Sequence, residues 1–365
     1  KSTPEAEEFL QTFLNEQVVP VSELPAEVDW RTHHPQVTTA VKQQGFCGSC
    51  WAVAAAAVME SHIALQTGQL YTLSPQEMVS CVTNPHHCGG DGGCGGATYE
   101  LAFEYVMQHG IVSEDDFPYE SGTGGDVECS LTEDTKDTTE PLFLRGTTTS
   151  NHHNNNNNHN HLQITMTKND GEEGFIDDAV ATIQGYVNFP TNNYTVLMNA
   201  VAQLGPIGVT VAASKWAFYS GGVFDGGNHN STGATDVNHA VVLEGYGVDP
   251  ETQEPYWLIR NSWGSWGEGG YIRLKRVDPN AYADTKQWEE ANCGVDMKPA
   301  DGAGCTKDAD GNDIVPPPVE VCGTSAVLYD TFVPIGGRLL QTKKSSQKNA
   351  EDVNNVITGQ ETQTE

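Results

Sequence analysis

The sequence predicts an α+β protein in which a helical first half precedes a strand-rich second half. Residues 50–110 contain three helix patterns with start and stop signals, whereas the apolar runs after Gly205 are short and separated by glycine-rich turns. Such an order favours two lobes that meet at a cleft. The 365 residues are enough for two units with ample core.

The first helix is expected directly after Cys50. Residues 51–60 are rich in alanine, the best helix former, and Gly68 supplies a stop signal. Because apolar residues surround this helix almost completely, we expect it to be buried through the middle of a domain.

Two further helices are predicted in the same half. The second begins after Ser74 as N-cap, with Pro75 at the first helical position and Glu77 completing a capping box. The third spans residues 99–109 and is stopped by Gly110.

The second half contains four predicted strands. They are the apolar runs at residues 206–211, 240–243, 256–259 and 271–274.

A polar stretch at residues 130–178 separates the two halves. It includes an asparagine- and histidine-rich tract at 151–161, which cannot bury apolar surface. We expect a disordered surface insertion there. The histidines are irregularly spaced and have no cysteine or acidic residue among them, so no metal site is predicted.

The net charge of the chain and the length of its apolar runs argue against nucleic acids and membranes as partners. The formal net charge is 18 − 49 = −31, which argues against nucleic acid and anionic membranes, because both repel such a chain. The longest apolar run has nine residues, 51–59, whereas a membrane-spanning helix needs about 20. The charge fits either an acidic compartment, where carboxylates become protonated, or simply a very soluble protein.

Nine cysteines leave one thiol over if the others pair, and a free thiol among bridges is either accidental or reactive. Two glycosylation sequons, at Asn193 and Asn230, fit a secretory route.

Cys50 is the candidate nucleophile. Residues 44–51 read Gln-Gly-Phe-Cys-Gly-Ser-Cys-Trp, which places Cys50 at the start of the buried helix. The positive end of a helix lowers the pKa of a thiol, and the thiolate is the reactive form. The Cys50 amide and the Gln44 side chain are expected to donate hydrogen bonds to an oxyanion.

His239 and Asn261 complete the candidate constellation. A nucleophilic thiolate needs a neighbouring base, and His239 stands at the head of an apolar strand, unlike the other eleven histidines. Asn261 follows the strand at 257–260 and can accept from the far imidazole N–H. Trp263 can shield that hydrogen bond from water.

In order and in local sequence these three segments resemble the papain family of cysteine peptidases, and the cathepsin L type rather than the cathepsin B type. The resemblance runs from about residue 24 to about residue 293, without the insertion. It implies a mainly helical left lobe at 24–129 and a β-barrel right lobe at 179–334, followed by a flexible tail at 335–365.

The resemblance also implies a mechanism. Cys50 and His239 would face each other across the cleft as a thiolate–imidazolium pair, and Cys50 would attack the scissile carbonyl. His239 would protonate the leaving amine, and water would release the acyl-enzyme. Gln44 would help to hold the oxyanion, and no cofactor is implied.

Substrate-binding residues follow from the same resemblance. They are Gly48, Gly95, Gly96, Ala97, Thr98, Tyr99, Thr210, Ala240, Trp263 and Trp266. Trp266 resembles the aromatic residue on the leaving-group side. The pocket for the second residue before the scissile bond is expected to have walls at Thr98, Tyr99, Thr210 and Ala240. Its floor would be either residues 293–298, with Lys298, or the apolar residues 322–327, which we favour.

The cysteines follow the family only in part. Cys47 with Cys94, and Cys81 with Cys129, resemble its two left-lobe bridges. The family usually has a cysteine shortly before the catalytic histidine, and residues 219–238 contain none. Three pairings therefore stay open for the remaining four residues: Cys88, Cys293, Cys305 and Cys322.

Two further departures concern the substrate. Ala97 replaces a customary glycine in a segment whose backbone pairs with substrate, and the stretch between Trp263 and Trp266 is one residue short. The interval from Cys50 to His239 is 189 residues against about 130–150 in relatives, and the insertion accounts for the excess.

Residues 1–23 resemble the end of a propeptide, which in relatives runs through the cleft and blocks it. We expect an incompletely matured form with a further cut near residues 21–24. Because Lys1 is not preceded by a methionine or an apolar signal region, the chain is expected to be a processed product.

The predicted activity is that of an endopeptidase acting on proteins or peptides. Alternatives are an exopeptidase, in which His86 and His87 bind a substrate terminus, and a peptide ligase. A non-catalytic homologue would usually lack the nucleophile. Cystatin-type or propeptide inhibitors, a monomeric state and a lysosomal, vacuolar or secreted location are expected.

Overall fold

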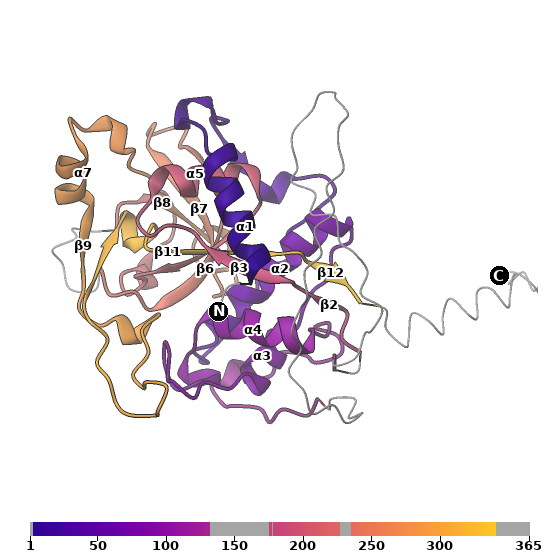
Figure 1. Ribbon diagram of the computed structural model, residues 1–365. Coiled ribbons are helices and arrows are strands. Elements are labelled where there is room, and N and C mark those ends of the chain that lie inside the picture. Colours follow the sequence, from indigo (N-terminus) through magenta and orange to yellow (C-terminus); the bar gives the residue numbers. More distant parts are fainter. Residues whose placement is uncertain (1–2, 132–174, 177, 227–234, 341–365) are drawn as a thin grey trace, which may run out of the picture.

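A computed structural model describes residues 3–131, 175–176, 178–226 and 235–340 of the chain. The α-helices are α1 (Pro4–Thr12), α2 (Cys50–Thr67), α3 (Pro75–Cys81), α4 (Tyr99–His109), α5 (Tyr194–Gln203), α6 (Trp266–Gly269) and α7 (Thr285–Asn292). The strands are β1 (Val28–Asp29), β2 (Ala181–Thr182), β3 (Gly185–Asn188), β4 (Ile207–Val211), β5 (Val223–Phe224), β6 (His239–Val248), β7 (Pro255–Arg260), β8 (Tyr271–Lys275), β9 (Cys293–Asp296), β10 (Val319–Cys322), β11 (Asp330–Ile335) and β12 (Arg338–Leu339). Helices α2, α3 and α4 gather on one side of the molecule and most strands on the other (Figure 1).

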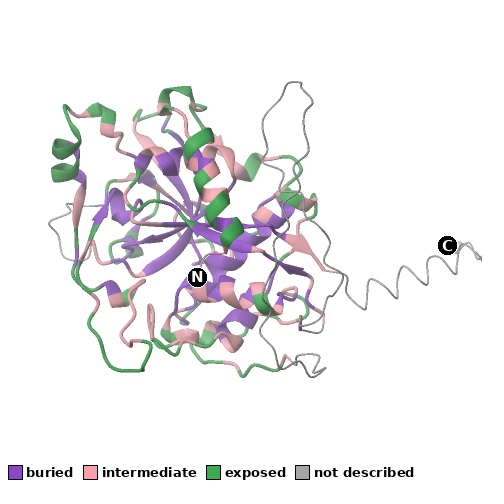
Figure 2. Ribbon diagram, viewed as in Figure 1, coloured by how far each residue is buried: buried purple, intermediate pink, exposed green. Residues whose placement is uncertain are grey.

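Helix α2 forms the centre of the helical lobe. Residues 51–61 are all buried, and Gly68 ends the helix with a positive φ of 75°. Its core extends through α4 to Ala240, Val242 and Phe332 of the sheet. The predicted central helix is therefore packed between the two halves of the chain, and Figure 2 shows it inside the buried region.

The second half is built on one eight-stranded mixed sheet. Its strand order is β3-β11-β4-β6-β7-β8-β5, and β1 pairs with β6. Strand β6 pairs antiparallel with β4, where His239 lies opposite Val211, and with β7, where Val242 lies opposite Arg260. This register brings the start of β6 close to the end of β7 and so brings His239 close to Asn261.

A buried polar network joins α2 to the sheet beneath this point. Glu60 accepts from Leu73 N at 2.8 Å and from Thr39 Oγ1 at 2.5 Å, and it pairs with Lys42 at 3.0 Å. Arg260 donates to Thr39 Oγ1 at 3.0 Å and pairs with Glu244 at 3.3 Å. The two lobes are therefore linked by charge as well as by apolar packing.

The three predicted helices and four predicted strands are all present, with one local correction. Ser74 Oγ accepts from Glu77 N at 3.1 Å, as an N-cap should. The Glu77 carboxylate accepts instead from Val112 N at 2.7 Å, and Ser74 N donates to Val112 O. The capping box is therefore only half formed, because Glu77 accepts from Val112 N and not from Ser74 N.

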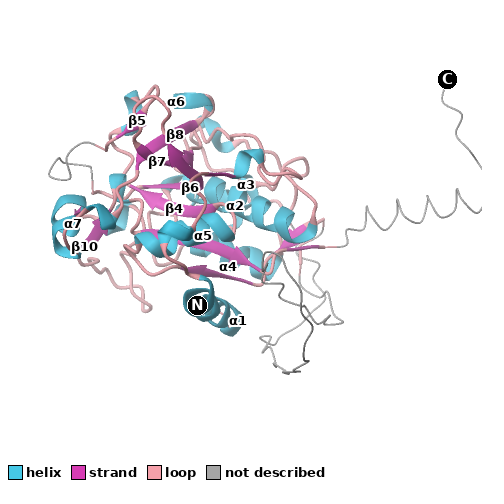
Figure 3. Cartoon of the chain, turned by 90° about the horizontal axis from the view of Figure 1, so that it is seen from above, coloured by secondary structure: helices cyan, strands magenta, loops and turns pink. Residues whose placement is uncertain are grey.

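The N-terminal segment is not in the cleft. Helix α1 packs against β3 and lies at the edge of the molecule in Figure 3. Phe13 contacts Phe189 with ring centroids 5.5 Å apart. Asn199 of α5 bonds both Val19 N and Val19 O at 2.9 Å. Residues 3–23 therefore pack on α5 and β3 and do not line the cleft, in contrast to the path that the resemblance gives for the propeptide in relatives.

The folded part extends beyond the predicted boundaries. Ile335 is buried and β12 pairs with β2, so residues 335–340 are ordered and not a loose tail. Ile176 donates from its N–H to His109 O at 2.9 Å and packs beside Val112. The tract at 151–161 and the rest of the tail lie outside the described residues.

The disulfides settle the pairings that sequence left open. Cys47–Cys94 and Cys81–Cys129 agree with the resemblance, and the other two bridges are Cys88–Cys305 and Cys293–Cys322. Cys50 is the one free cysteine, and all nine lie within the described residues.

Candidate active site

Cys50 is the first residue of α2 and is half-buried. The turn before it is tight, because a Cβ on Gly48 would lie 2.6 Å from the Cys94 carbonyl oxygen. The first amides of a helix have no intrahelical acceptor, so the Cys50 N–H is available to a ligand. Position and chemistry together fit an activated thiol.

His239 and Asn261 form a buried pair beside Cys50. The imidazole Nε2–H donates to Asn261 Oδ1 at 2.8 Å, which leaves Nδ1 for the thiol. Trp263 stacks on the imidazole with centroids 5.0 Å apart and planes at 30°. The side chains of His239 and Asn261 are almost shielded from water, and the asparagine fixes the orientation of the ring.

Cys50 and His239 shift each other's pKa. Burial alone would raise the pKa of the Cys50 thiol, but the charge of His239 and its hydrogen bond lower it overall. Burial alone would lower the pKa of His239, but the Cys50 charge and the hydrogen bonds to Cys50 and Asn261 raise it overall. The pair therefore favours the thiolate–imidazolium form.

Gln44 is held rigidly next to Cys50. Its Oε1 accepts from Ser262 Oγ at 2.5 Å, and its Nε2 donates to Cys47 O at 2.9 Å. An amide nitrogen has two hydrogens, so one N–H remains for a ligand. Gln44 is thus preorganised to donate to an oxyanion.

A cleft of about 250 Å³ runs past these residues and is lined from both lobes. Cys50, His239 and Gln44 line it, and so do most of the predicted substrate-binding residues: Gly48, Gly95, Gly96, Ala97, Thr98, Tyr99, Thr210, Ala240 and Trp263. Trp266 does not line it; its ring stacks on Trp216 with centroids 6.1 Å apart.

The comparison with known proteins decides the family. Residues 24–300 match the family described as "Papain family cysteine protease". The chain belongs to the papain family.

Individual relatives agree with this assignment. The chain is 34% identical over 283 residues to the "KDEL-tailed cysteine endopeptidase CEP2" of Arabidopsis thaliana, covering 76% of this chain and 59% of the relative. It is 34% identical over 258 residues to a "Cathepsin L-like" protein of Caenorhabditis elegans, covering 70% and 60%. The chain thus spans about three fifths of the length of these curated relatives.

The fold agrees as well. The structure of the bromelain protease from Ananas comosus in complex with the E64 inhibitor superimposes with a TM-score of 0.52 and 26% identity. That match covers 86% of this chain and 100% of bromelain. The two-lobed α+β prediction is therefore confirmed.

Sequence reasoning missed several residues of the cleft. Gly89, Asn238, Asp301 and Gly302 also line it. Asp301 and Gly302 lie in the loop between β9 and β10, which reaches the cleft because Cys305 is bonded to Cys88. The available signal was the pair of cysteines that had no counterpart in the family pattern.

Neither proposed floor of the specificity pocket is found there. Lys298 is exposed, Val327 is fully buried in the core, and neither lines the cleft. Asp330 lies behind the pocket wall, where it accepts from Tyr99 OH and from Thr210 Oγ1, the latter at 2.6 Å. Burial raises the pKa of Asp330, opposed by its hydrogen bonds.

The two histidines of the exopeptidase alternative do not line the cleft either. His86 contacts Asp308 O at 3.0 Å, and His87 contacts Asp91 at 2.7 Å. They hold the loop geometry rather than the position of a substrate terminus.

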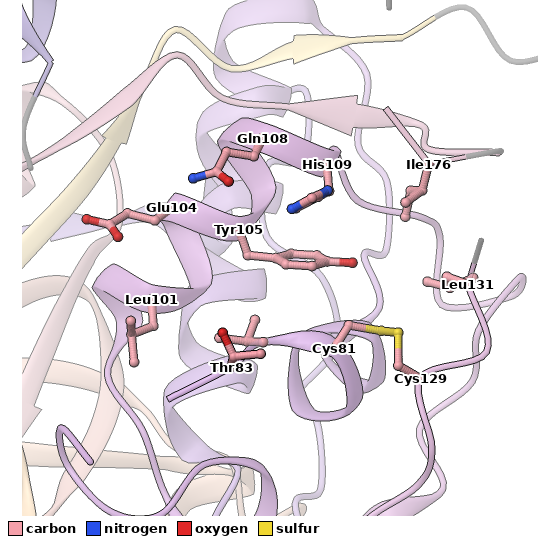
Figure 4. Close-up of a pocket in the computed structure, with 11 residues that line it drawn as sticks. Cys81, Thr83, Leu101, Glu104, Tyr105, Gln108, His109, Cys129, Leu131 and Ile176 are labelled. Carbon is pink, nitrogen blue, oxygen red and sulfur yellow. A yellow bond between two sulfur atoms is a disulfide. The ribbon is translucent and has the colours of Figure 1, made fainter. Parts of the chain in front are cut away.

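A second hollow, of about 320 Å³, lies on the helical lobe (Figure 4). Leu101, Tyr105 and His109 of α4 border it together with the Cys81–Cys129 bridge. It shares no lining residue with the catalytic cleft.

Two other predictions concern the surface. Asn193 is exposed and caps α5, with Oδ1 accepting from Val196 N at 3.0 Å, whereas Asn230 lies outside the described residues. In the part of the chain that the structure describes, no helix is long and apolar enough to cross a membrane, and no three potential ligands gather as for a metal ion.

Proposed function

We propose that this chain is a cysteine endopeptidase that hydrolyses peptide bonds in proteins and peptides. The observation that carries the proposal is the single free thiol, Cys50, at the start of α2 and beside the buried His239–Asn261 pair. Membership of the papain family and the cleft lined from both lobes support it.

Each side chain has a role in the proposed reaction. The Cys50 thiolate attacks the scissile carbonyl carbon, and the carbonyl oxygen becomes an oxyanion held by the Cys50 N–H and Gln44 Nε2. Collapse of this intermediate breaks the C–N bond, while the His239 imidazolium gives its proton to the leaving amine. His239 then takes a proton from water, which attacks the thioester and frees Cys50.

Asn261 acts as a positioning residue in this scheme. As a neutral acceptor it holds the imidazole without adding charge, and the stacked Trp263 keeps water from the bond. The backbone of Gly95, Gly96 and Ala97 is proposed to pair with the substrate chain, with Gly48, Thr98, Tyr99, Thr210 and Ala240 around it.

The finer biological assignments are proposals as well. Residues 1–23 are proposed to be a propeptide remnant, and Asn193 a glycosylation site whose amide nitrogen is free of its capping role. Cystatin-type or propeptide inhibitors, a monomeric state and a lysosomal, vacuolar or secreted location are also proposed, on the family resemblance.

Cleavage of a peptide blocked at both ends tests the activity. The substrate carries an internal quenched fluorophore and is incubated at mildly acidic pH with a thiol reductant. We expect cleavage at an internal bond by the native chain and none by Cys50→Ala. Activity only on peptides with a free terminus, or undiminished activity of Cys50→Ala, would contradict an endopeptidase acting through this thiol.

A further inference from the structure

The loop between β9 and β10, residues 297–318, crosses from the sheet to the helical lobe. Figure 1 shows it descending from β9 towards the loops near α3. We refer to residues 297–318 as the strap. It is fixed to the sheet lobe at its base, where Asp296 accepts from Val237 N at 3.2 Å.

The far end of the strap is fastened to the helical lobe. The Cys88–Cys305 disulfide joins residues 217 positions apart. Gly89 N donates to Gly304 O at 3.1 Å, and Lys307 N donates to His86 O at 3.0 Å. With Thr306 N donating to His87 O at 3.3 Å, one covalent bond and three backbone hydrogen bonds fasten the strap to the helical lobe.

The middle of the strap lies inside the cleft. Asp301 and Gly302 line the cleft together with Cys50 and His239. A Cβ on Gly302 would lie 2.2 Å from the Val237 carbonyl oxygen, so the strap backbone rests directly on the segment that precedes His239.

Gly89 shows the contact on the opposite wall. A Cβ there would lie 2.7 Å from Gly302 O and 3.0 Å from Ala97 O. The strap thus spans the gap between Val237 and the Gly89–Ala97 wall. On the family resemblance, the backbone at Ala97 pairs with the acyl side of the substrate, which is the part N-terminal to the scissile bond.

We propose that the fastened strap closes the acyl side of the cleft, so that a polypeptide reaches Cys50 only after the Cys88–Cys305 bond is reduced. The inference rests on the proposed function and adds its regulation. A dithiol reductant would supply two electrons and two protons, becoming a disulfide while Cys88 and Cys305 become thiols. Three backbone hydrogen bonds and the His86 contact with Asp308 O then remain between the strap and the helical lobe, and because such bonds open and close transiently, the strap can swing from the wall.

The test compares small and extended reagents on the whole chain. Labelling of Cys50 is followed by mass spectrometry without reductant, using iodoacetamide and an epoxide attached to four amino acids on the acyl side. The native chain is compared with the double variant Cys88→Ser/Cys305→Ser. We expect iodoacetamide to label both chains at the same rate. The extended epoxide should label the native chain at least about tenfold more slowly than the double variant.

Two further variants separate closure from a general effect of the disulfide. Gly302→Val keeps the bridge but cannot rest on Val237, so we expect faster labelling by the extended epoxide. Asp313→Ala removes only the exposed pair with Lys307 at the strap tip and should behave like the native chain.

The outcomes distinguish this proposal from the function itself. Equal ratios of extended to small-reagent rates in the native chain and the double variant would overturn the strap proposal. Cys50 that reacts with iodoacetamide no faster than an ordinary thiol, in every variant, would overturn the proposed function instead.

Discussion

The reactivity of Cys50 depends on two opposing effects at the scale of single residues. Burial penalises the thiolate, whereas His239 and the start of α2 stabilise it. The same pairing raises the pKa of His239 despite its burial. The two charges must therefore form together, and each neighbour that holds one of them affects both.

Gln44 is the clearest test of oxyanion stabilisation. Replacing Gln44 by Ala removes a fixed N–H donor, and we expect kcat to fall about 100- to 1000-fold with a much smaller change in KM. Steady-state kinetics on the quenched peptide measure this. The exposed neighbour Gln43, which does not line the cleft, serves as control through Gln43→Ala. An equal fall in both variants would show a structural effect only.

Asn261 should control the alkaline limb of the pH–rate profile. The imidazolium is the active form of His239, so activity is lost as pH rises through its pKa. Because the bond to Asn261 raises this pKa, Asn261→Ala should move the alkaline limb of kcat/KM to lower pH and reduce its maximum about 10- to 100-fold. Asn261→Asp adds a negative charge and should move the limb to higher pH. An unmoved limb in both variants would rule out the positioning role.

The residues proposed to be catalytic could be predicted because each of their motifs is local. Residues 44–51, 238–247 and 261–264 carry their meaning in contiguous sequence. Asp301 and Gly302 were not predictable, because they reach the cleft only through a disulfide between distant residues. The floor of the specificity pocket could not be predicted for the same reason, since the burial of Val327 and the exposure of Lys298 depend on packing between strands.

At the scale of elements, α2 carries the site because it is held from both lobes. Its alanine-rich sequence predicted the helix and its burial, and Gly68 predicted its end. Helix α7 and strands β9 and β10 were not predicted, because their apolar residues show no clear helix or strand spacing. The Cys293–Cys322 bridge, which joins β9 to β10, stabilises this region. Local pattern specifies the central helix, whereas cross-links specify the peripheral elements.

Glu60 tests the polar link between α2 and the sheet. This carboxylate is 1% exposed and accepts from three groups, so Glu60→Ala leaves Lys42 and Leu73 N without their partner. We expect a loss of about 3–5 kcal/mol in the free energy of unfolding. Chemical denaturation measures it, with the exposed Glu251→Ala as control. A loss no larger than that of the control would show that the network contributes little to stability.

On the scale of the whole molecule, buried acids set the response to pH. Burial raises the pKa of Glu77 to about 8, opposed by its hydrogen bonds to Val112 and Tyr105. Burial and the charge of Asp330 raise the pKa of Glu100 to about 7. Burial lowers the pKa of His62 to about 4, opposed by the hydrogen bond that its ring donates to Pro206 O.

These shifts predict a fold that is more stable in mild acid than at neutral pH. Between about pH 4.5 and the raised pKa, each of these carboxyls keeps its proton in the folded state but loses it in the unfolded state. Glu77 and Glu100 therefore lower the free energy of unfolding as pH rises. His62 has the opposite effect between about pH 4 and 6.5, because there it is neutral in the folded state and protonated in the unfolded state. In that range it offsets the effect of one of the two acids on the free energy of unfolding.

The free energy of unfolding should therefore fall between about pH 4.5 and 8, by about 1.4 kcal/mol per pH unit for each acid not offset. Denaturant unfolding across this range measures it. Glu77→Gln should flatten the fall between about pH 7 and 8, because Glu100 has already lost its proton there and Glu77 is the acid that would still titrate. A free energy of unfolding that rises steadily from pH 5 to 8 would contradict this account. Greater stability in mild acid agrees with the expectation of an acidic compartment.

Labelling of Cys50 by a thiol-directed epoxide inhibitor tests the central claim most directly. The chain is first treated with a reductant at mildly acidic pH, so that the strap is released, and the label is then located by mass spectrometry. We predict that Cys50 of the native chain is labelled rapidly with loss of peptide cleavage, and that His239→Ala is labelled far more slowly. Equal labelling of Cys50 in the native chain and in His239→Ala, or retained cleavage after complete labelling, would contradict a thiolate–imidazolium pair as the catalytic centre.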